Sequence, residues 1–241
     1  MSKNSLGVLF RLSTFGESHG PYVGGIIDGC PAGIPVDYEL INRKVKERQT
    51  GMFAYSSARK EDDHIEFISG IDKSKTTGTP LAFIVKNKDV DISNYQDNSE
   101  ILKPSSATFT YWKKYKNEGF YVNGRASARE TIARVIGGCF AMMLLKQQHI
   151  HIQAFTTQIG NVSISKNINF NAVNSNPLRC PDAETSEQMM KLLHQIASEK
   201  DSIGAQVMCR VENLPIGLGE PVFDKLNADL SKALMSIPAA K

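Results

Sequence analysis

The sequence predicts an α+β fold, in which strands and helices come in separate groups. Short runs rich in β-branched and aromatic residues predict the strands. The clearest helix is predicted at 127–148, where apolar residues recur at i, i+3, i+4, i+7 and i+8. Because no regular βα repeat joins the strands, a doubly wound parallel sheet describes the pattern less well.

The first part of the chain is predicted to hold several strands and one helix. Polar and glycine-rich residues at 14–21 predict a turn between two of the strands. Asp37 is placed to cap a helix that runs to about Gln49, because apolar residues follow it one turn apart. The strands expected in this part are 7–11, 22–28, 65–70 and 81–85, with a further turn at 76–80.

Residues 86–123 are polar and irregular, so they predict a long loop. It contains the basic aromatic run Tyr111-Trp112-Lys113-Lys114-Tyr115-Lys116, and a loop of that length is usually functional or mobile. Ser127 with Glu130 forms a capping box, which predicts that the next helix begins near Ser127. Beyond that helix we expect strands at 150–159 and 206–211 and helices at 185–198 and 221–236.

The composition is that of a folded, water-soluble protein. The chain has 241 residues, of which 41% are hydrophobic and 22% charged. Its formal net charge of +3 is too small to argue for a nucleic-acid partner. No stretch approaches the roughly 20 apolar residues that cross a bilayer, and the first residues lack the apolar core of a secretion signal. We therefore expect a cytoplasmic protein without a membrane partner.

The cysteine spacing argues against a zinc site and against a small disulfide framework. Cys30, Cys139, Cys180 and Cys209 lie far apart without a CxxC pair, so we expect all four to be reduced packing residues. The histidines other than His19 have no cysteine or carboxylate partner at ligand spacing, and we expect no metal. No linker-like segment divides the chain, which predicts a single domain over residues 1–241.

The segment Gly16-Glu17-Ser18-His19-Gly20 fits the G-x-S-x-G pattern of a serine hydrolase. That motif needs several strands before it and a helix directly after it, whereas Pro21 and a strand pattern follow here. It is better described as a tight turn that presents a carboxylate, a hydroxyl and an imidazole. His19 is the group of this set that exchanges a proton near neutral pH, which makes it a candidate acid or base. The alternative is a histidine that only hydrogen-bonds its own turn.

A candidate anion site lies at the start of the strongest helix, in the run Gly124-Arg125-Ala126-Ser127-Ala128-Arg129-Glu130-Thr131. Free N–H groups and the helix dipole favour an anion there, and the small residues permit a close approach to the backbone. Arg125 and Arg129 would add forked donors for phosphate or carboxylate. Two arginines at the positive end of a helix are unfavourable without an anion, which favours binding. The alternative is that Arg129 pairs with Glu130 or with aspartates of the loop, and that Ser127 only caps the helix.

A further basic set surrounds the end of the helix that Asp37 caps, namely Arg43, Lys44, Lys46, Arg48, Arg59 and Lys60. Cations stabilise a helix C-terminus by themselves, so most of this set is expected to be a solvated face. Arg48 is the residue of the set that we keep as a binding candidate.

Taken together, the two motifs closely resemble the N-terminal signatures of the chorismate synthase family. The first signature is Thr14-Phe15-Gly16-Glu17-Ser18-His19-Gly20, and the second is the run that begins at Gly124. Other segments agree in order and spacing, at 28–35, 69–79, 201–205 and 217–236. The resemblance therefore covers the whole chain.

The resemblance implies a lyase of the shikimate pathway, in aromatic amino acid biosynthesis. Members of the family convert 5-enolpyruvylshikimate-3-phosphate into chorismate by an anti-1,4-elimination of phosphate, and they require reduced FMN that is not consumed overall. In bifunctional members NADPH serves as the reductant. The implied fold is a β-α-β sandwich with helices packed between antiparallel sheets, here incomplete at the C-terminus, and the implied assembly is a homotetramer.

The resemblance also implies roles for individual residues. His19 would donate a proton near the flavin or the leaving phosphate. Arg48 would contact the substrate or, in bifunctional members, NADPH. The residues implied to lie on FMN are Arg125, Ala126, Ser127, Pro238 and Ala239, and those implied to hold the anionic substrate are Glu17, Ser18, Arg129 and Arg134.

Position 106 departs from the family pattern, because Ser106 stands at the catalytic position where the family has its second histidine. Family members also continue beyond the matched part, into a third signature with further flavin and substrate contacts. These departures leave an alternative open. The chain would then be a truncated or degenerate non-catalytic relative that retains only a weak flavin or anion site, or only the family's oligomer contacts.

Overall fold

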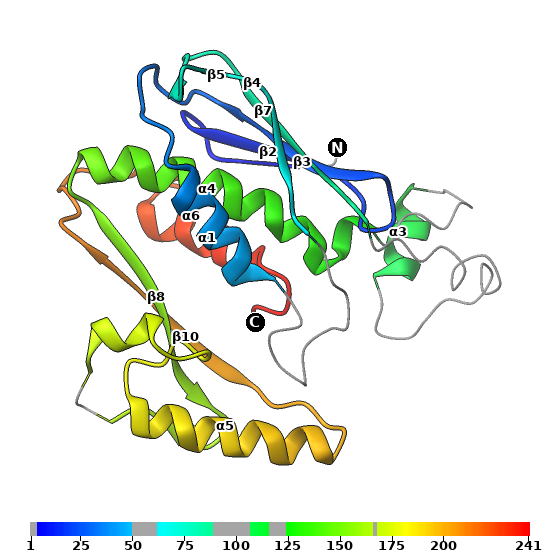
Figure 1. Ribbon diagram of the computed structural model, residues 1–241, viewed down its shortest axis with the longest axis vertical. Helices are drawn as coiled ribbons and strands as arrows, with labels where there is room; N and C mark the ends of the chain where they lie inside the picture. The colour runs from blue at the N-terminus through cyan, green and yellow to red at the C-terminus, as the bar shows by residue number, and fades with distance from the viewer. Residues whose placement is uncertain (1–3, 50–61, 89–106, 116–123, 166–167) are drawn as a thin grey trace. The chain divides into compact units, whose positions relative to one another are not determined.

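The computed structural model of the chain describes residues 4–49, 62–88, 107–115, 124–165 and 168–241 (Figure 1). By its internal contacts the chain divides into two compact units. The first comprises Met1–Met52, Ser57–Leu144 and Pro215–Lys241, and the second comprises Phe53–Ser56 and Leu145–Leu214. The single domain expected over residues 1–241 stays a prediction.

The first unit contains a five-stranded antiparallel sheet in the order β1-β2-β3-β7-β4. Strand β3 lies at its centre and pairs with β2 through Gly24 and Phe15 and with β7 through Gly25 and Phe83. Two short strands, β5 and β6, pair with each other in a separate sheet. The strands are β1 (Ser5–Leu6), β2 (Arg11–Gly16), β3 (Tyr22–Asp28), β4 (Ile65–Ser69), β5 (Ile71–Asp72), β6 (Lys75–Thr76) and β7 (Leu81–Lys86).

The helices of the first unit carry the residues that matter for the site. Asp37 caps α1 as predicted, and its carboxylate accepts a hydrogen bond of 2.8 Å from the backbone N–H of Leu40. A 3₁₀ turn, η2, leads directly into the long helix α4. The described helices of this unit are α1 (Tyr38–Arg48), α3 (Thr108–Tyr115), η2 (Ala128–Glu130), α4 (Thr131–Gln147, of which the last three residues belong to the second unit) and α6 (Leu226–Met235).

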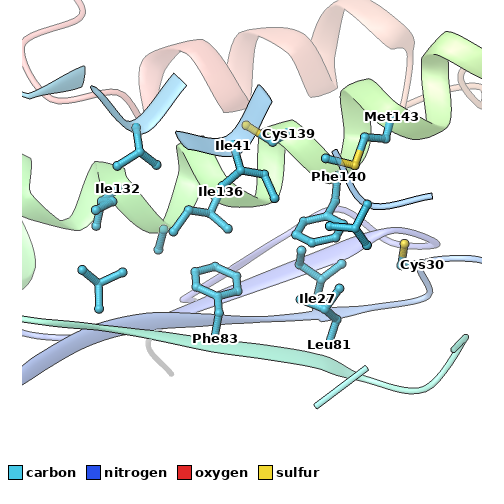
Figure 2. Close-up of a cluster of buried hydrophobic side chains, with 14 of the residues drawn as sticks. Ile27, Cys30, Ile41, Leu81, Phe83, Ile132, Ile136, Cys139, Phe140 and Met143 are labelled. Carbon is cyan, nitrogen blue, oxygen red and sulfur yellow. The ribbon is translucent and has the colours of Figure 1, made fainter. Parts of the chain in front are cut away.

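The core of this unit lies between one face of the sheet and helices α1 and α4 (Figure 2). Phe67 of β4 packs edge to face on Phe83 of β7 and on Phe140 of α4, with ring centroids 6.3 and 5.9 Å apart. Truncating a buried ring such as that of Phe140 to alanine costs about 3–5 kcal/mol. The other large core residues are Ile41 on α1, Ile132 and Ile136 one turn apart on α4, and Val23, Ile27, Leu81 and Val85 at alternating positions on β3 and β7.

The second unit contains a three-stranded antiparallel sheet in the order β10-β8-β9. Its buried cluster is centred on Ile159, Cys180 and Met189. Asp182 caps the helix α5, and its carboxylate accepts hydrogen bonds from both the backbone N–H and the hydroxyl of Thr185. The elements are β8 (His151–Ile159), β9 (Val162–Ser163), η3 (Phe170–Asn174), α5 (Ala183–Ser198) and β10 (Ala205–Glu212).

The structure confirms the α+β class and corrects several boundaries. The strand expected at 7–11 lies instead at Arg11–Gly16, because Thr14 and Phe15 continue the pairing with β3. The helix expected from residue 221 begins only at Leu226. Within the loop expected at 86–123, the basic aromatic residues from Tyr111 to Tyr115 lie on helix α3.

The four cysteines are free, as expected, but they are not all packing residues. Cys30, Cys139 and Cys180 are buried, whereas Cys209 is exposed on β10. The prediction was wrong for Cys209, because every residue of β10 is exposed.

Candidate active site

The first sequence motif forms the turn between β2 and β3, and hydrogen bonds to its backbone hold it in place. The side-chain amide of Asn87 donates to the carbonyl oxygens of Glu17 and Gly20, at 2.9 and 2.7 Å. The backbone N–H of Ser18, which is buried, donates to the carbonyl oxygen of Gly124 at 3.3 Å. The turn is therefore fixed both by the end of β7 and by the second sequence motif.

Gly124 allows the two motifs to meet. A Cβ at this position would lie 2.3 Å from the Cβ of Glu17 and 2.7 Å from the backbone nitrogen of Ser18. No side chain fits into that space, so glycine is required here for steric reasons. The structure thus brings together two segments that the sequence keeps far apart.

Arg129 of the second motif is buried and bound to protein partners. Its Nε donates to the Oδ1 of Asn87 at 2.9 Å, and its Nη1 forms an ion pair with Asp63. The side chains of Arg129 and Asp63 are only 3% and 1% exposed. Asp63 also pairs with Arg48 of α1, with 3.3 Å between Nη2 and Oδ2. One buried carboxylate therefore holds two of the arginines that were predicted to contact the substrate.

Asp63 and Asn87 were both missed by sequence reasoning. The aspartate partner expected for Arg129 was in the loop that begins at residue 86, but Asp63 precedes β4. Asn87 follows directly on β7. A polar residue at the end of a buried strand was the one available signal for Asn87, and nothing in the local spacing identifies Asp63.

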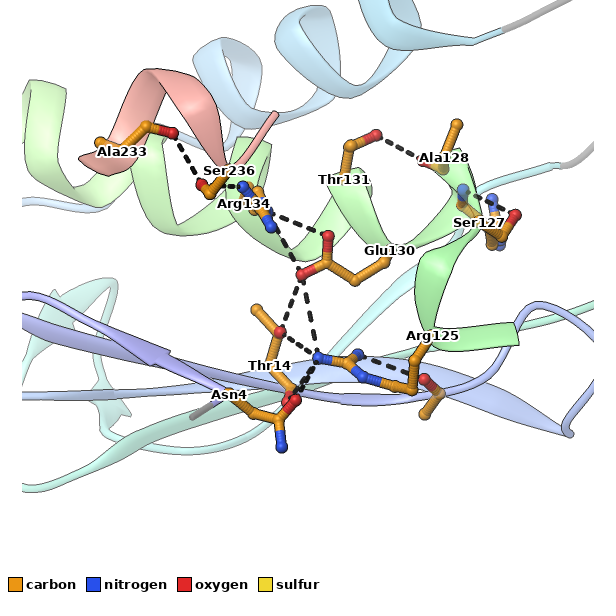
Figure 3. A network of polar contacts seen from close by, with 12 residues as sticks. Asn4, Thr14, Arg125, Ser127, Ala128, Glu130, Thr131, Arg134, Ala233 and Ser236 are labelled. Atoms are coloured by element: carbon orange, nitrogen blue, oxygen red, sulfur yellow. Dashed lines mark hydrogen bonds and ion pairs between the residues drawn. The ribbon is translucent and has the colours of Figure 1, made fainter. Parts of the chain in front are cut away.

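Arg125 reaches back over the end of β2 (Figure 3). It donates to the carbonyl oxygen of Gly16 at 3.2 Å, to the hydroxyl of Thr14 at 2.7 Å and to the side-chain oxygen of Asn4 at 3.1 Å. With the backbone carbonyl oxygen of Thr14, which it also contacts at 3.2 Å, four acceptor atoms hold its guanidinium group, so its position is well defined without a ligand.

Glu130 and Arg134 extend the same network along α4 (Figure 3). The Nε of Arg134 donates to the two carboxylate oxygens of Glu130, at 2.9 and 3.3 Å. The Nη1 of Arg134 donates to the hydroxyl of Ser236 at 2.7 Å. The arginine therefore links the start of α4 to the residue that follows α6.

Ser127 caps a 3₁₀ turn and not the long helix. Its hydroxyl accepts a hydrogen bond from the backbone N–H of Arg129 at 3.3 Å, and η2 follows. The predicted helix start near Ser127 was therefore four residues too early, because α4 begins at Thr131. The carboxylate of Glu130, which a capping box would turn back toward Ser127, instead contacts Thr14 and Arg134.

A cavity of about 810 Å³ lies beside this network and is lined by strands β1 and β2, by α4 and by the end of the chain. That volume is in the range of ordinary small-molecule sites. Among its described lining residues, Arg125, Arg134 and Lys232 are cationic and Glu130 is the single acid, so that positive charge prevails. The cavity is also lined by Thr14, Tyr111, Gly138, Ser236 and Ile237.

The remaining predicted site residues lie at different places. Pro238 and Ala239 are exposed and directly follow Ile237, which lines the cavity. Ala126 is exposed, and neither it nor Ser127 is among the described lining residues. His19 is half-buried in the turn; its buried Nδ1 makes no hydrogen bond to the described residues, although the residue has another interaction. Ser106 lies outside the described residues.

Comparison with known proteins decides the family. A family model described as chorismate synthase matches residues 10–241. The chain belongs to the chorismate synthase family. Proteins named chorismate synthase from Christiangramia forsetii and Phocaeicola vulgatus are 43% and 44% identical to it, over 100% and 99% of this chain and 68% and 67% of their own.

A solved crystal structure of chorismate synthase supports the same assignment at the level of the fold. It matches 96% of this chain and 67% of its own length, with a TM-score of 0.79 and 27% sequence identity. The chain thus spans about two thirds of the length of these family members. The resemblance inferred from the two motifs and the α+β class are both confirmed.

The described residues contain neither a cluster of metal ligands nor a membrane-spanning helix. Within those residues no group of three or more His, Cys, Asp or Glu side chains is arranged to hold a metal ion. No helix in the described part of the chain combines the length and the apolar character that a membrane span needs.

Proposed function

We propose that the chain catalyses the elimination of phosphate from 5-enolpyruvylshikimate-3-phosphate to give chorismate. The observation that carries this proposal is the contact between the two motifs, in which Gly124 packs against Glu17 and Ser18. This contact places the candidate acid His19 and the arginine-rich start of α4 in one region of the first unit. Membership of the chorismate synthase family supports the same reaction.

Reduced FMN is the proposed cofactor, and the cavity beside α4 has the chemistry to receive it. A flavin mononucleotide needs cations for its phosphate and an apolar wall for its ring system, and the cavity offers Arg125 and Lys232 together with aliphatic side chains. The reduced flavin would supply electron density to the elimination. Of the residues predicted to contact FMN, Arg125 lines this cavity, and Pro238 directly follows Ile237, which also lines it. Ala126, Ser127 and Ala239 stay proposed contacts.

The arginines of the site are proposed to bind the anionic substrate. Expulsion of a phosphate requires positive charge where negative charge develops. Arg48, Arg129 and Arg134 are the proposed cations, and Glu17 and Ser18 are proposed to contact the substrate from the turn. Because Asp63 holds both Arg48 and Arg129, those two guanidinium groups would share their charge between Asp63 and the substrate.

His19 is proposed to donate a proton to the leaving phosphate. Histidine is the side chain that changes its protonation near neutral pH, and the turn is fixed tightly enough to aim it. Ser106 is the second catalytic position of the proposal, and it stands where the family has a histidine. We further propose that NADPH is the reductant, that the chain assembles as a homotetramer and that it works in the cytoplasm.

An anaerobic assay tests the reaction. Purified protein is mixed with photoreduced FMN and the enolpyruvyl substrate, and both chorismate and inorganic phosphate are followed in time. Equal amounts of both products are expected. A chain that binds FMN but releases neither product would be a non-catalytic relative, and this result would reject the proposed activity.

A cavity-filling variant tests the flavin site. Gly138 lines the cavity, and a Cβ there would have no neighbour within 4 Å, so Gly138→Leu should fill the space without displacing protein. We expect FMN binding to weaken by about tenfold or more, which corresponds to about 1.4 kcal/mol. Gly204→Leu is the matched control, because that glycine is equally open and lies in the second unit. Equal FMN affinity in the two variants would place the flavin elsewhere.

A further inference from the structure

A buried carboxylate lies between two arginines of the cavity wall. The side chain of Glu130 is 6% exposed, and it pairs with Arg134 at 2.9 Å and with Arg125 at 4.0 Å (Figure 3). All three residues line the cavity. Glu130 was expected to complete a capping box or to pair with Arg129, and the structure gives it different partners.

The contact between Glu130 and Arg125 is relayed by a hydroxyl. Arg125 donates to the Oγ1 of Thr14 at 2.7 Å, and Thr14 donates to the Oε1 of Glu130 at 2.8 Å. The carboxylate thus receives hydrogen bonds from two directions, one along α4 and one from β2. Charge-assisted hydrogen bonds of this kind are stronger and more directional than neutral ones.

The place of Glu130 in the fold suits a fixed negative charge. It immediately precedes Thr131, the first residue of α4, where the positive end of the helix dipole favours an anion. The two arginines are long side chains that sample many rotamers when they are free. A buried carboxylate that both of them contact restricts them before any ligand arrives.

A carboxylate beside an anion site weakens the binding of an anion there. By Coulomb's law alone, Glu130 repels a phosphate that approaches Arg125 or Arg134. Its presence in the cavity wall therefore favours ligand binding only if the orientation it imposes on the arginines outweighs this repulsion. The two effects have opposite signs, so they can be separated by experiment.

We propose that Glu130 is a positioning residue that fixes Arg125 and Arg134 at the cavity wall, ready for the phosphate group of a ligand. The identity of that ligand, FMN or the phosphorylated substrate, rests on the proposed function. The orientation of the two arginines does not depend on it.

The binding test compares three variants by FMN titration, followed by flavin fluorescence, and repeats the titration with the enolpyruvyl substrate. E130Q keeps the shape of the side chain and removes its charge, and E130D keeps the charge with a shorter reach. E212Q is the control, because it removes the same charge from an exposed glutamate that pairs with Arg210. We expect E130Q to weaken binding by about tenfold or more, E130D to recover part of the loss and E212Q to match the wild type. Unchanged or tighter binding by a folded E130Q chain would overturn the inference.

Whichever ligand shows the loss identifies the phosphate that the two arginines receive. If the wild-type chain binds neither ligand, the proposed function fails at this step. The inference on Glu130 is then decided by a second measurement that needs no ligand.

That measurement is nitrogen-15 NMR of the arginine Nε–H groups, assigned with Arg125→Lys and Arg134→Lys. In the wild type, the Nε–H of Arg134 donates to Glu130 and should exchange slowly with water. We expect E130Q and E130D both to change this signal and to speed its exchange, whereas E212Q should leave it unchanged. An Arg134 signal that is the same in E130Q as in the wild type would show that Glu130 does not position the arginine. Circular dichroism checks that each variant is folded. If E130Q does not fold, the titration and the NMR measurement are both decided by E130D.

Discussion

Gly124 and Glu17 lie so close that a Cβ on Gly124 would be 2.3 Å from the Cβ of Glu17. Real Cβ atoms do not approach so closely, so Gly124→Ala must push the turn away from the start of the second motif. We expect this variant to lose most of its activity and to be destabilised by about 1–3 kcal/mol, since overpacking shifts the backbone. Chorismate formation and urea unfolding measure the two effects. Gly204→Ala, which adds a methyl group in open space, should behave as the wild type.

Asp63 pairs with two arginines, Arg48 and the buried Arg129, and its removal should be costly. Asp63→Asn leaves Arg129, whose side chain is 3% exposed, without its carboxylate. Breaking a buried pair in this way costs about 3–5 kcal/mol. Asp28→Asn is the comparison, because Asp28 pairs with Arg11 where both side chains are half exposed, and the expected loss is about 1 kcal/mol or less. Equal midpoints of urea unfolding for the two variants would contradict the buried network.

Thr14 connects Arg125 to Glu130 through a single hydroxyl. Thr14→Val keeps the shape and leaves both charged groups short of one hydrogen bond, which should cost about 1–3 kcal/mol. The control is Thr79→Val, since the exposed hydroxyl of Thr79 bonds only that of Thr77 among the contacts described, and surface changes of this kind stay within about 0.5 kcal/mol. Thermal unfolding of both variants measures the difference, and a Thr14→Val chain as stable as the control would exclude a role for the relay.

Asp182 should make the second unit sensitive to acid. Hydrogen bonds from the backbone N–H and the hydroxyl of Thr185 lower the pKa of Asp182 to about 2. Because the pKa is depressed in the folded chain, the cap stabilises α5 fully above about pH 4, the ordinary range of an aspartate, and its contribution disappears as the pH falls through 2. Asp182→Ala should cost about 1 kcal/mol at pH 7 and little at pH 2. Urea unfolding at both pH values measures this, and a loss that does not depend on pH would contradict it.

Cysteine reactivity should separate one thiol from the other three. Burial raises the pKa of Cys30, Cys139 and Cys180, that of Cys139 to about 11, while Cys209 is exposed. Because the thiolate is the reactive form, iodoacetamide near pH 8 should modify Cys209 in the folded chain and all four thiols only in urea. Peptide mass mapping shows which cysteines are modified. Rapid labelling of Cys139 in the native protein would mean that its part of the core opens.

Local patterns predicted most elements of the fold. The strands at Ile65–Ser69 and Leu81–Lys86 and the helix capped by Asp37 follow from periodicity and capping alone. The start of α4 was misplaced, because the carboxylate of Glu130 is drawn to Thr14, a residue on a distant strand. The extent of β2 was missed for a similar reason, since pairing with β3 decides it.

The candidate site was predicted in part. The second motif identified Arg125 and the family resemblance implied Arg134; both line the cavity, and family membership is confirmed by comparison. The partners of the arginines were not predicted, because Asp63, Asn87 and Ser236 become neighbours only when the chain folds. A motif in the sequence identifies the groups that react or bind, and it does not identify the residues that orient them.

Asn87 donates its hydrogen bonds to the carbonyl oxygens of Glu17 and Gly20, so these bonds hold the backbone of the turn whatever side chains it carries. Substitutions at Glu17 or His19 would leave these anchors in place. A combinatorial library at those two positions would therefore vary the side chains of the turn while its backbone conformation stays the same. In laboratory evolution, new activities could therefore be selected at this turn while the fold stays unchanged.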